Sequence, residues 1–457
     1  MIPPAHQMAR QAVQRSESGS PPVTTRIESL SHDCAGVAHV DGKTVFIEGA
    51  LPGELVTFSY RRRKKNHDVA ELIEIVEAVA LRVEPRCRYF GVCGGCTLQH
   101  MDAHAQLEAK QQVVRDNLLH IGKTVAESWL APVTGPHWGY RRRARLGARV
   151  VDKKGGVILG FHERRNSYIT PLASCDVLLP AIARLLPATR NLIAGLSCAN
   201  RIPQVEVSAG DDAVAFVFRH LTPFTDDDRA RLAAFGDTHG VRVMLQPQGP
   251  DSLHDLGSDV ATDLRYDLPA FGVNIAFAAN DFIQVNADVN RGLVARAIEL
   301  LDPQPGDAVL DLFCGLGNFT LPIAKRAGRV LGVEADARMV ARARRNAAAN
   351  GLTHAEFRVC DLYAPDASPD WQGFNKWLID PPRDGAVEIL RRLEPGNTPE
   401  RIVYVSCHPA TLARDAQVLT GLHGYRLAAA GVADMFPQTA HVESIALFVR
   451  ATEPHEN

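Results

Sequence analysis

One cysteine of this 457-residue chain lies where a nucleophile would be expected, at the end of a buried strand. The apolar run at residues 402–405 predicts a short strand, and the pair His408-Pro409 ends it, because proline disfavours strand interiors. Cys407 therefore lies at a carboxyl strand end, where open α/β sheets bind their ligands. A thiol there can be a nucleophile, but a buried structural cysteine is the commoner fate of a free cysteine. This stretch alone is equally compatible with both.

A second group of thiols, Cys87, Cys93 and Cys96, has the spacing C-x5-C-x2-C. The glycines between the last two let the backbone wrap closely around one centre. Three thiolates at this spacing indicate a metal ion or an iron–sulfur cluster. A fourth ligand is needed, and Cys175 is favoured because it follows a turn in the same half of the chain; Cys198 is the alternative. The spacing does not separate tetrahedral zinc from a four-iron cluster.

Glycines and acidic residues follow successive predicted strands in the C-terminal part of the chain. From about residue 280 strands and helices alternate, which is typical of an α/β domain. The strand at 308–313 runs into Gly315 and Gly317, and such glycines let a ligand approach a helix N-terminus. An acid ending the next strand suits ribose hydroxyls, and a third acid can contact an adenine amino group. The strand ends are Gly315/Gly317, Glu334, Asp361, Asp380 and Cys407.

This series predicts a complete nucleoside site along one edge of one sheet. The dinucleotide pattern G-x-G-x-x-G is interrupted at Thr320, so a NAD site is the less favoured alternative. The turn that begins at Asp311 is the type used by S-adenosylmethionine methyltransferases.

The N-terminal part has the pattern of a small β-barrel. Residues 23–79 alternate in the β manner, with a hairpin signal at Asp41-Gly42, and predict five short strands in a closed barrel of the oligonucleotide-binding type. The basic run 61–65 falls between two of these strands and is expected on a loop. It could contact phosphates or be a solvated turn. The same two alternatives apply to a strand face formed by Arg141, Arg143 and Arg145.

Composition and charge set the broad class of protein. Hydrophobic content of 46% and charged content of 22% are ordinary for a globular protein. We expect a cytoplasmic protein, because no apolar run approaches the roughly 20 residues of a membrane span. Nine irregularly spread cysteines argue against a disulfide framework. Residues 21–165 carry 22 Lys and Arg against 16 Asp and Glu, whereas residues 166–457 carry 26 against 35. This asymmetry favours a polyanion-binding platform joined to an enzyme body.

The chain resembles the bacterial RNA 5-methyluridine methyltransferases, in particular the 23S rRNA branch that carries a TRAM domain and an iron–sulfur cluster. The TRAM resemblance rests on the pattern at residues 36–54. In the rest of the chain the resemblance rests on the four cysteines and on five segments, 281–286, 311–315, 380–383, 406–415 and 441–443.

Residues 1–22 are polar and contain several Pro and Ser residues, so we expect them to form a disordered tail. The resemblance implies three domains after this tail. A TRAM-like RNA-binding barrel of the OB type is expected at 23–82. A central α+β domain with the cluster is expected at 83–265, and a Rossmann-like class I methyltransferase domain at 266–457. The implied partner is 23S rRNA, with no membrane and no obligate protein partner.

The same resemblance assigns roles to individual positions. It implies Cys407 as nucleophile and Glu443 as base, and His408 departs from the Asn that is usual in the family. The implied ligands of a [4Fe-4S] cluster are Cys87, Cys93, Cys96 and Cys175. The implied S-adenosyl-L-methionine contacts are Gln284, Phe313, Asn318, Glu334, Asp361 and Asp380.

The expected chemistry starts with addition of the Cys407 thiolate to C6 of uracil, which makes C5 nucleophilic. After methyl transfer Glu443 removes the C5 proton, while Asp380 and Gln284 orient the base or the cofactor. The cluster is expected to be structural or to position RNA. Alternatives are the same reaction on another rRNA uridine or on tRNA, an RNA cytosine-5 methyltransferase, and an iron–sulfur RNA-binding sensor without activity.

Overall fold

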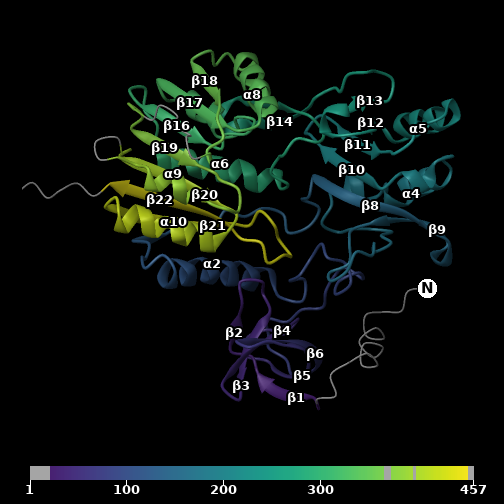
Figure 1. Ribbon diagram of the computed structural model, residues 1–457, viewed down its shortest axis with the longest axis horizontal. Coiled ribbons are helices and arrows are strands. Elements are labelled where there is room, and N and C mark those ends of the chain that lie inside the picture. The colour runs from purple at the N-terminus through teal and green to yellow at the C-terminus, as the bar shows by residue number, and fades with distance from the viewer. Residues whose placement is uncertain (1–20, 365–371, 395–397, 451–457) are drawn as a thin grey trace, which may run out of the picture.

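The computed structural model describes residues 21–364, 372–394 and 398–450, so most of the expected tail at 1–22 lies outside the described residues. Three bodies are visible: a small barrel, a central mixed sheet and a large α/β sheet (Figure 1). Within these described ranges no helix is long and apolar enough to cross a membrane.

The N-terminal body is a six-stranded sheet that curls into a barrel, one strand more than expected. Its order is β1-β5-β6-β4-β3-β2, and the two edge strands are consecutive in the chain. The link between them closes the sheet, because Ile27 N donates to Glu54 O on one side and Glu28 N to Val37 O on the other. The strands are β1 (Val23–Arg26), β2 (Ser29–Leu30), β3 (Gly36–Val40), β4 (Lys43–Glu48), β5 (Leu55–Arg63) and β6 (His67–Glu77).

The basic run was expected on a loop, and this was wrong for its first three residues. Arg61, Arg62 and Arg63 continue β5 as an exposed strand end that pairs with β6, and only Lys64 and Lys65 form the turn. The strand extends because Arg62 and Arg63 pair with β6, and the Arg63 guanidinium also lies 4.1 Å from the centroid of the Tyr60 ring. The cations are still displayed to solvent.

The central body is a mixed sheet of order β13-β12-β11-β10-β8-β9. Its helices are α3 (Pro180–Ala183), α4 (Leu186–Ala194) and α5 (Asp226–His239), the last starting with a capping box between Thr225 and Asp228. A two-stranded sheet, β14 (Leu264–Leu268) with β15 (Val273–Phe277), follows it. The strands are β8 (Arg143–Val151), β9 (Gly156–Gly160), β10 (Gln204–Ala209), β11 (Val214–Arg219), β12 (Arg242–Gln246) and β13 (His254–Asp255).

The arginines of β8 are not a free cationic face. Arg143 is largely buried and its Nη2 lies 2.5 Å from Glu206 Oε1, while Arg145 Nε lies 3.3 Å from the other oxygen of that carboxylate. Arg141 precedes the strand, and its Nε donates to the Arg143 carbonyl. Glu206 on the neighbouring strand β10 therefore neutralises much of the predicted patch.

The C-terminal body is an eight-stranded sheet of order β18-β17-β16-β19-β20-β22-β21-β7. The first five strands are mutually parallel and β22 is antiparallel to both neighbours. This topology confirms the class I methyltransferase fold expected for this part of the chain. The strands are β16 (Ala308–Leu312), β17 (Arg329–Glu334), β18 (Ala355–Val359), β19 (Lys376–Ile379), β20 (Arg401–Ser406), β21 (Tyr425–Ala433), β22 (Glu443–Arg450) and β7 (Ser128–Trp129).

Helices cover both faces of this sheet. On one face α6 (Ala287–Leu301), α7 (Thr320–Ala324) and α8 (Ala337–Ala349) contribute to one apolar core. On the other, α9 (Val387–Arg391) and α10 (Pro409–Gly421) contribute to a second core.

The helix α2 (Ala103–His120) packs beside α10, although it precedes the central sheet in the chain (Figure 1). Val113, Val114 and Leu118 form its buried apolar face, whereas Leu119 on the outer side of the helix is exposed.

Candidate functional site

The turn after β16 is shaped for a ligand. Gly315 and Gly317 both have positive φ, at 54° and 90°, and Phe313 has φ 64°. Positive φ in a non-glycine residue such as Phe313 marks a constrained position. Thr320, which interrupts the dinucleotide pattern, donates from Oγ1 to Asp311 Oδ2 at 2.5 Å. Complete burial raises the pKa of Asp311 to about 8. The hydrogen bond between Thr320 and Asp311 thus connects the two ends of the turn.

Glu334 at the end of β17 is fixed against this turn. Its Oε2 accepts a hydrogen bond from Gly315 N at 3.2 Å. Its Oε1 accepts from Ala335 N at 2.8 Å and from Asp336 N at 3.0 Å. A carboxylate has about four acceptor positions, so Glu334 keeps capacity for a ligand hydroxyl.

Asn318 lies in a polar network that the sequence did not reveal. Its Oδ1 accepts from Tyr266 Oη at 2.9 Å and from Asn290 Nδ2 at 3.0 Å, and its Nδ2 donates to Asn290 Oδ1 at 2.9 Å. Tyr266 comes from β14 and Asn290 from α6, so only the folded chain brings them to the turn. Gln284 is placed by buried Arg142, whose Nε donates to the Gln284 carbonyl at 3.0 Å.

Phe313 and Asp361 lie beside a further unpredicted residue, Tyr363. The rings of Phe313 and Tyr363 have centroids 5.6 Å apart, and Asp361 Oδ1 accepts from Tyr363 N at 3.0 Å. Tyr363 Oη donates to Gly385 O at 2.9 Å, which ties this end of the site to the segment after Asp380. An aromatic pair beside an exposed carboxylate suits a flat base with an amino group.

Three candidate catalytic residues lie at the ends of three adjacent strands. Ser406 pairs with Ser444, and Ser444 Oγ donates to Ser406 O at 3.1 Å. Cys407 directly follows β20, and Glu443 is the first residue of β22. Asp380 directly follows β19, the parallel neighbour of β20. The sheet therefore brings together three residues separated by up to 63 positions in the sequence.

Cys407, Glu443 and Asp380 are three acidic groups in close proximity, and their negative charges disfavour one another. Burial raises the pKa of Cys407 to about 11, the Glu443 and Asp380 carboxyls raise it as well, and Arg383 lowers it. Burial raises the pKa of Glu443 well above its usual range, and Asp380 adds to this. Burial raises the pKa of Asp380 to about 7. Perturbed groups gathered in this way are typical of catalytic sites.

Two histidines beside Cys407 were not assigned a function from the sequence. His408 is the N-cap of α10, with its ring Nδ1 accepting from Thr411 N at 3.4 Å. This accounts for the position, since Asn is also a favoured N-cap. His441 Nδ1 lies 3.4 Å from Nη2 of Arg383, the residue that lowers the pKa of Cys407. His441 therefore lies near the group formed by Cys407, Glu443 and Asp380.

Four thiols line one small cavity in the cysteine-rich segment. Cys87, Cys93, Cys96 and Cys175 face it together with Phe90 and Phe161, among others, whereas Cys198 does not line this cavity. Cys198 is instead buried in the adjoining apolar core of the central body. Burial raises the pKa of Cys93 to about 11 and that of Cys96 to about 12. Among the residues that the structure describes, no three His, Cys, Asp or Glu side chains are close enough to hold one metal ion.

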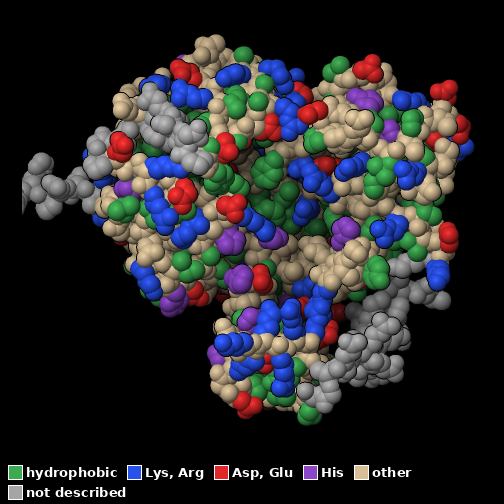
Figure 2. Space-filling model, in the orientation of Figure 1, with side chains coloured by type: hydrophobic (Ala, Val, Ile, Leu, Met, Phe, Trp, Pro, Cys, Tyr) green, Lys and Arg blue, Asp and Glu red, His purple; other side chains and the backbone are tan. Residues whose placement is uncertain are grey.

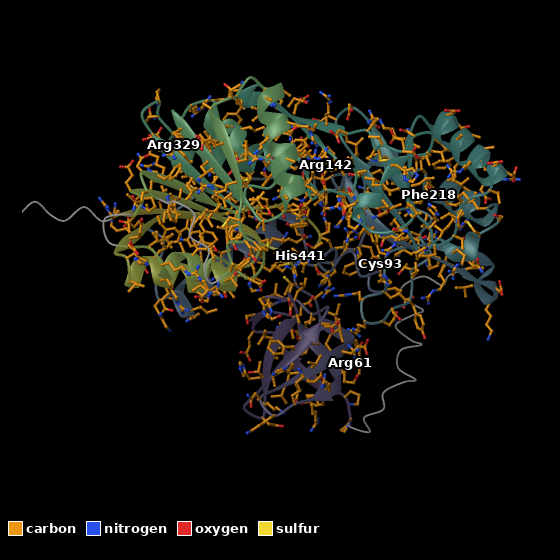
Figure 3. All side chains as sticks on the ribbon, turned by 45° about the horizontal axis from the view of Figure 1, so that its top comes forward. Arg61, Cys93, Arg142, Phe218, Arg329 and His441 are labelled. Carbon is orange, nitrogen blue, oxygen red and sulfur yellow. The ribbon has the colours of Figure 1, made fainter. Side chains whose placement is uncertain are left out.

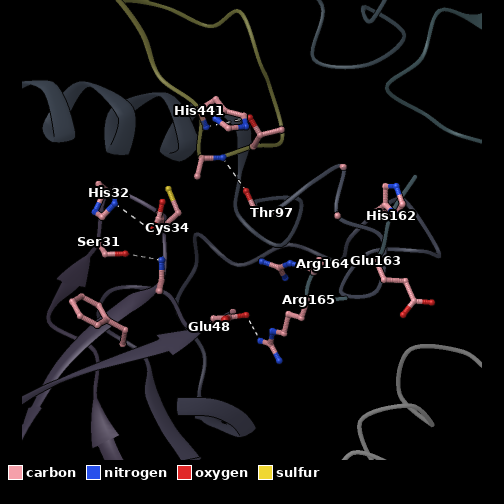
Figure 4. Close-up of a pocket in the computed structure, with 18 of the residues that line it drawn as sticks. Ser31, His32, Cys34, Glu48, Thr97, His162, Glu163, Arg164, Arg165 and His441 are labelled. Atoms are coloured by element: carbon pink, nitrogen blue, oxygen red, sulfur yellow. Dashed lines mark hydrogen bonds and ion pairs between the residues drawn. The ribbon is translucent and has the colours of Figure 1, made fainter. Parts of the chain in front are cut away.

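A cleft of about 1030 Å³ separates the barrel from the rest of the molecule. It is bordered by residues 31–35 of the barrel, by 94–97 and 161–165 near the cysteines, and by 439–441 before Glu443 (Figure 4). Lys and Arg side chains gather on the part of the barrel that faces the other domains (Figure 2). His441 and Cys93 both lie between the barrel, marked by Arg61, and the two larger sheets (Figure 3).

Fold and site together define an S-adenosylmethionine-type class I methyltransferase. The family model described as tRNA (Uracil-5-)-methyltransferase matches residues 267–362 and 367–451. The chain is 53% identical to the 23S rRNA (uracil(1939)-C(5))-methyltransferase RlmD of Aromatoleum aromaticum and 52% identical to that of Thiobacillus denitrificans; each match covers 93% of this chain and 99% of the relative.

A solved structure covers the same span. The Pyrococcus abyssi tRNA (uracil-54, C5)-methyltransferase in complex with S-adenosyl-L-homocysteine is 25% identical, with a TM-score of 0.69 over 93% of this chain and 100% of that one. The chain belongs to the RNA uracil-5-methyltransferase family, and it is an enzyme.

Proposed function

We propose that this enzyme transfers a methyl group from S-adenosyl-L-methionine to C5 of a uridine in 23S rRNA, through a covalent bond between Cys407 and C6 of the base. The observation that carries the proposal is the arrangement of Cys407, Glu443 and Asp380 on three adjacent strand ends beside the glycine turn. The names of the relatives at about 50% identity support the substrate.

The residues around the turn fit S-adenosylmethionine. Glu334 would accept from the ribose hydroxyls, Asp361 and Phe313 would hold the adenine, and Asn318 and Gln284 would contact the rest of the cofactor. The carboxyl end of β19 places Asp380 between this site and Cys407. When bound, the cofactor supplies an electrophilic methyl group.

The chain's own residues account for the remaining steps. The Cys407 thiol has a high pKa, so a neighbouring carboxylate must take its proton as the sulfur bonds to C6. The electrons of the C5–C6 double bond move onto C5 and O4. C5 would then bond to the methyl carbon as the bond from that carbon to the cofactor's sulfur breaks, with its electron pair left on the sulfur. Glu443 removes the C5 proton, the double bond re-forms, and the bond from C6 to Cys407 breaks.

The barrel and the cleft supply a route for RNA. The barrel at 23–82, of the TRAM type, presents Arg61 to Arg63 on an exposed strand end, and cationic side chains of this kind contact phosphates. His32 and Asp33 of the barrel lie close enough to His408 to influence its pKa. RNA held on the barrel would thus reach Cys407 across the cleft, with its target base unstacked. We place the central domain at 83–265 and the methyltransferase domain at 266–457.

We propose in addition that the four thiols hold a [4Fe-4S] cluster. The chemistry of the donor set fits, because burial disfavours the thiolate forms and bound iron would offset that cost. A four-iron cluster binds each thiolate through a different iron, so the thiols need not meet at one point. Anaerobically purified protein should be brown, with about four irons per chain, and Cys93→Ser should lose both. A colourless wild-type protein with one zinc would refute the cluster.

The substrate is tested by mapping tritium from labelled S-adenosylmethionine. Ribosomal and transfer RNA from cells lacking the enzyme would be the acceptors, and labelled fragments would be digested to nucleosides. We expect 5-methyluridine in one 23S rRNA fragment, and uracil 1939, named for the relatives, is the first position to examine. Label in tRNA instead would refute the rRNA assignment, and label in 5-methylcytidine would refute the uracil chemistry.

A further inference from the structure

The catalytic base begins a strand whose preceding loop is buried and constrained. Residues 434–442 join β21 to β22 and end directly at Glu443. Met435 and Gln438 are 0% and 3% exposed. Gln438 has φ 69°, a left-handed conformation that a residue with a side chain adopts only when its surroundings enforce it.

Gln106 on α2 supplies part of this enforcement. Gln438 N donates to Gln106 Oε1 at 3.0 Å, and Gln106 Nε2 donates to Gln438 Oε1 at 3.1 Å. The same amide nitrogen also reaches Met101 O at 2.8 Å and Leu98 O at 3.1 Å. Gln106 is 3% exposed, so its amide and the groups bonded to it form hydrogen bonds with the protein in place of water. Losing the side chain would leave several buried polar atoms unsatisfied.

Lys110 lies one helical turn further on the same face of α2. Its Nζ is 2.7 Å from Asp434 Oδ1 and donates to Phe436 O at 3.0 Å. The two side chains are 2% and 4% exposed. A buried ion pair is costly to break, because the remaining charge is left unpaired. Lys110 therefore fixes the start of the loop while Gln106 fixes its middle.

The residues that follow Cys96 hold the same loop through two backbone N–H groups and one side-chain hydroxyl. Thr97 N and Leu98 N donate to Gln438 O at 2.9 and 3.0 Å. Ala440 N donates to Thr97 Oγ1 at 2.8 Å (Figure 4). The thiol segment and α2 thus both contact the loop, and both bind Gln438.

We propose that Gln106 and Lys110 are positioning residues for the methyl-transfer reaction: they hold the loop 434–442 so that Glu443 stays beside Cys407 and Asp380. This rests on the proposed role of Glu443 as the base that removes the C5 proton. Neither residue touches the thiol or the turn that binds the cofactor, so both act on the reaction through the loop.

A loosened loop should affect one step more than the others. Addition of Cys407 to C6 and methyl transfer precede proton removal, so misplacing Glu443 stalls the reaction after both. Displacement of a catalytic group by about 1 Å can cost about a hundredfold in rate. The enzyme should then accumulate on unmodified natural RNA as a methylated covalent adduct at Cys407.

The test compares two substitutions on one helix. Gln106→Met removes the hydrogen bonds to Gln438, whereas Gln112→Met removes an exposed glutamine whose bond is to Asp116 on α2 itself. We expect Gln106→Met to lower kcat about a hundredfold, with unchanged KM for S-adenosylmethionine and more RNA-linked enzyme on a denaturing gel. Gln112→Met should match the wild type in all three measurements.

Two further variants make the outcome decisive. Glu443→Gln is the reference for adduct accumulation; if it accumulates none, the proposed function fails, whatever Gln106 does. If Glu443→Gln accumulates adduct but Gln106→Met keeps wild-type kcat, or loses activity without adduct, the positioning role is refuted. Should circular dichroism show Gln106→Met to be unfolded, the neutral double variant Lys110→Met/Asp434→Asn decides by the same criteria.

Discussion

Cys407 and Glu443 lie one position beyond the last paired residues, Ser406 and Ser444, of two antiparallel neighbouring strands. The proposed nucleophile and the proposed base therefore lie at adjacent strand ends, and their spacing is set by the backbone ladder. The antiparallel strand β22 is what makes this possible. A parallel strand would present its other end at this edge.

The acidity of Cys407 should respond in opposite directions to its two charged neighbours. Ionised Asp380 raises the thiol pKa and Arg383 lowers it. Asp380, with a pKa of about 7, is ionised at pH 8.5. Asp380→Asn should therefore lower the thiol pKa and speed alkylation of Cys407 by iodoacetamide, whereas Arg383→Gln should slow it. One pKa unit corresponds to about a tenfold change in thiolate at this pH.

The rate of Cys407 alkylation is measured from pH 7 to 10.5 by mass spectrometry of the peptide that contains Cys407. Wild-type alkylation should still be rising at pH 10, because the pKa is about 11. A plateau below pH 8, or the same direction of change in both variants, would contradict the electrostatic description of the site.

Binding of S-adenosylmethionine should depend on the charge of Glu334. Both oxygens of the Glu334 carboxylate accept backbone N–H groups. In Glu334→Gln, the amide NH2 would face one of these N–H donors without being able to accept from it. The substitution also removes the negative charge that would attract the ribose hydroxyls. We expect affinity to fall at least tenfold by calorimetry, which is about the strength of one charged hydrogen bond. Glu356→Gln, an exposed glutamate on β18, is the matched control and should bind normally.

His408 should be replaceable by Asn without loss. Burial, with Arg383, lowers the pKa of His408, so near neutral pH the ring is uncharged and Nδ1 can accept at the helix N-terminus. Asn fulfils the same role, whereas His408→Ala removes the cap and should cost about 1 kcal/mol. Thermal unfolding and turnover of both variants check this; equal stability of the Ala and His proteins would show that the cap contributes nothing.

The barrel should contribute to RNA affinity through its charge. Arg62→Gln on the exposed end of β5 should weaken RNA binding at low salt and reduce the slope of log affinity against log salt by about 0.7. Arg358→Gln, an equally exposed arginine on β18, should leave both unchanged. Identical salt slopes for the two variants would place the RNA elsewhere.

The sequence predicted one part of the cofactor half well, namely the series of candidate residues at strand ends. Gly315, Glu334, Asp361, Asp380 and Cys407 lie at or just after the ends of parallel strands, and parallel strands align their carboxyl ends. Periodicity and turn residues are local signals, so they suffice for such a series. The expected orientation of these ends toward one edge was confirmed by the strand order.

Long-range partners were not predictable in this way. Nothing local links Tyr266 or Asn290 to Asn318, or Lys110 to Asp434, which is 324 residues away. The arginines of β8 likewise suggested a free cationic face, because their partner Glu206 lies on a strand paired only after folding. The basic run continued β5 where a turn was expected, since pairing with β6 outweighs the local preference of charged residues for loops.

The covalent role of Cys407 is tested most directly by trapping with RNA that contains 5-fluorouridine. Fluorine at C5 cannot be removed by Glu443 as a proton is, so the reaction stops at the methylated adduct. We expect wild-type enzyme with S-adenosylmethionine to form a denaturation-resistant complex with this RNA, and expect Cys407→Ala to form none. A complex that forms with Cys407→Ala, or wild-type turnover without any complex, would contradict the account.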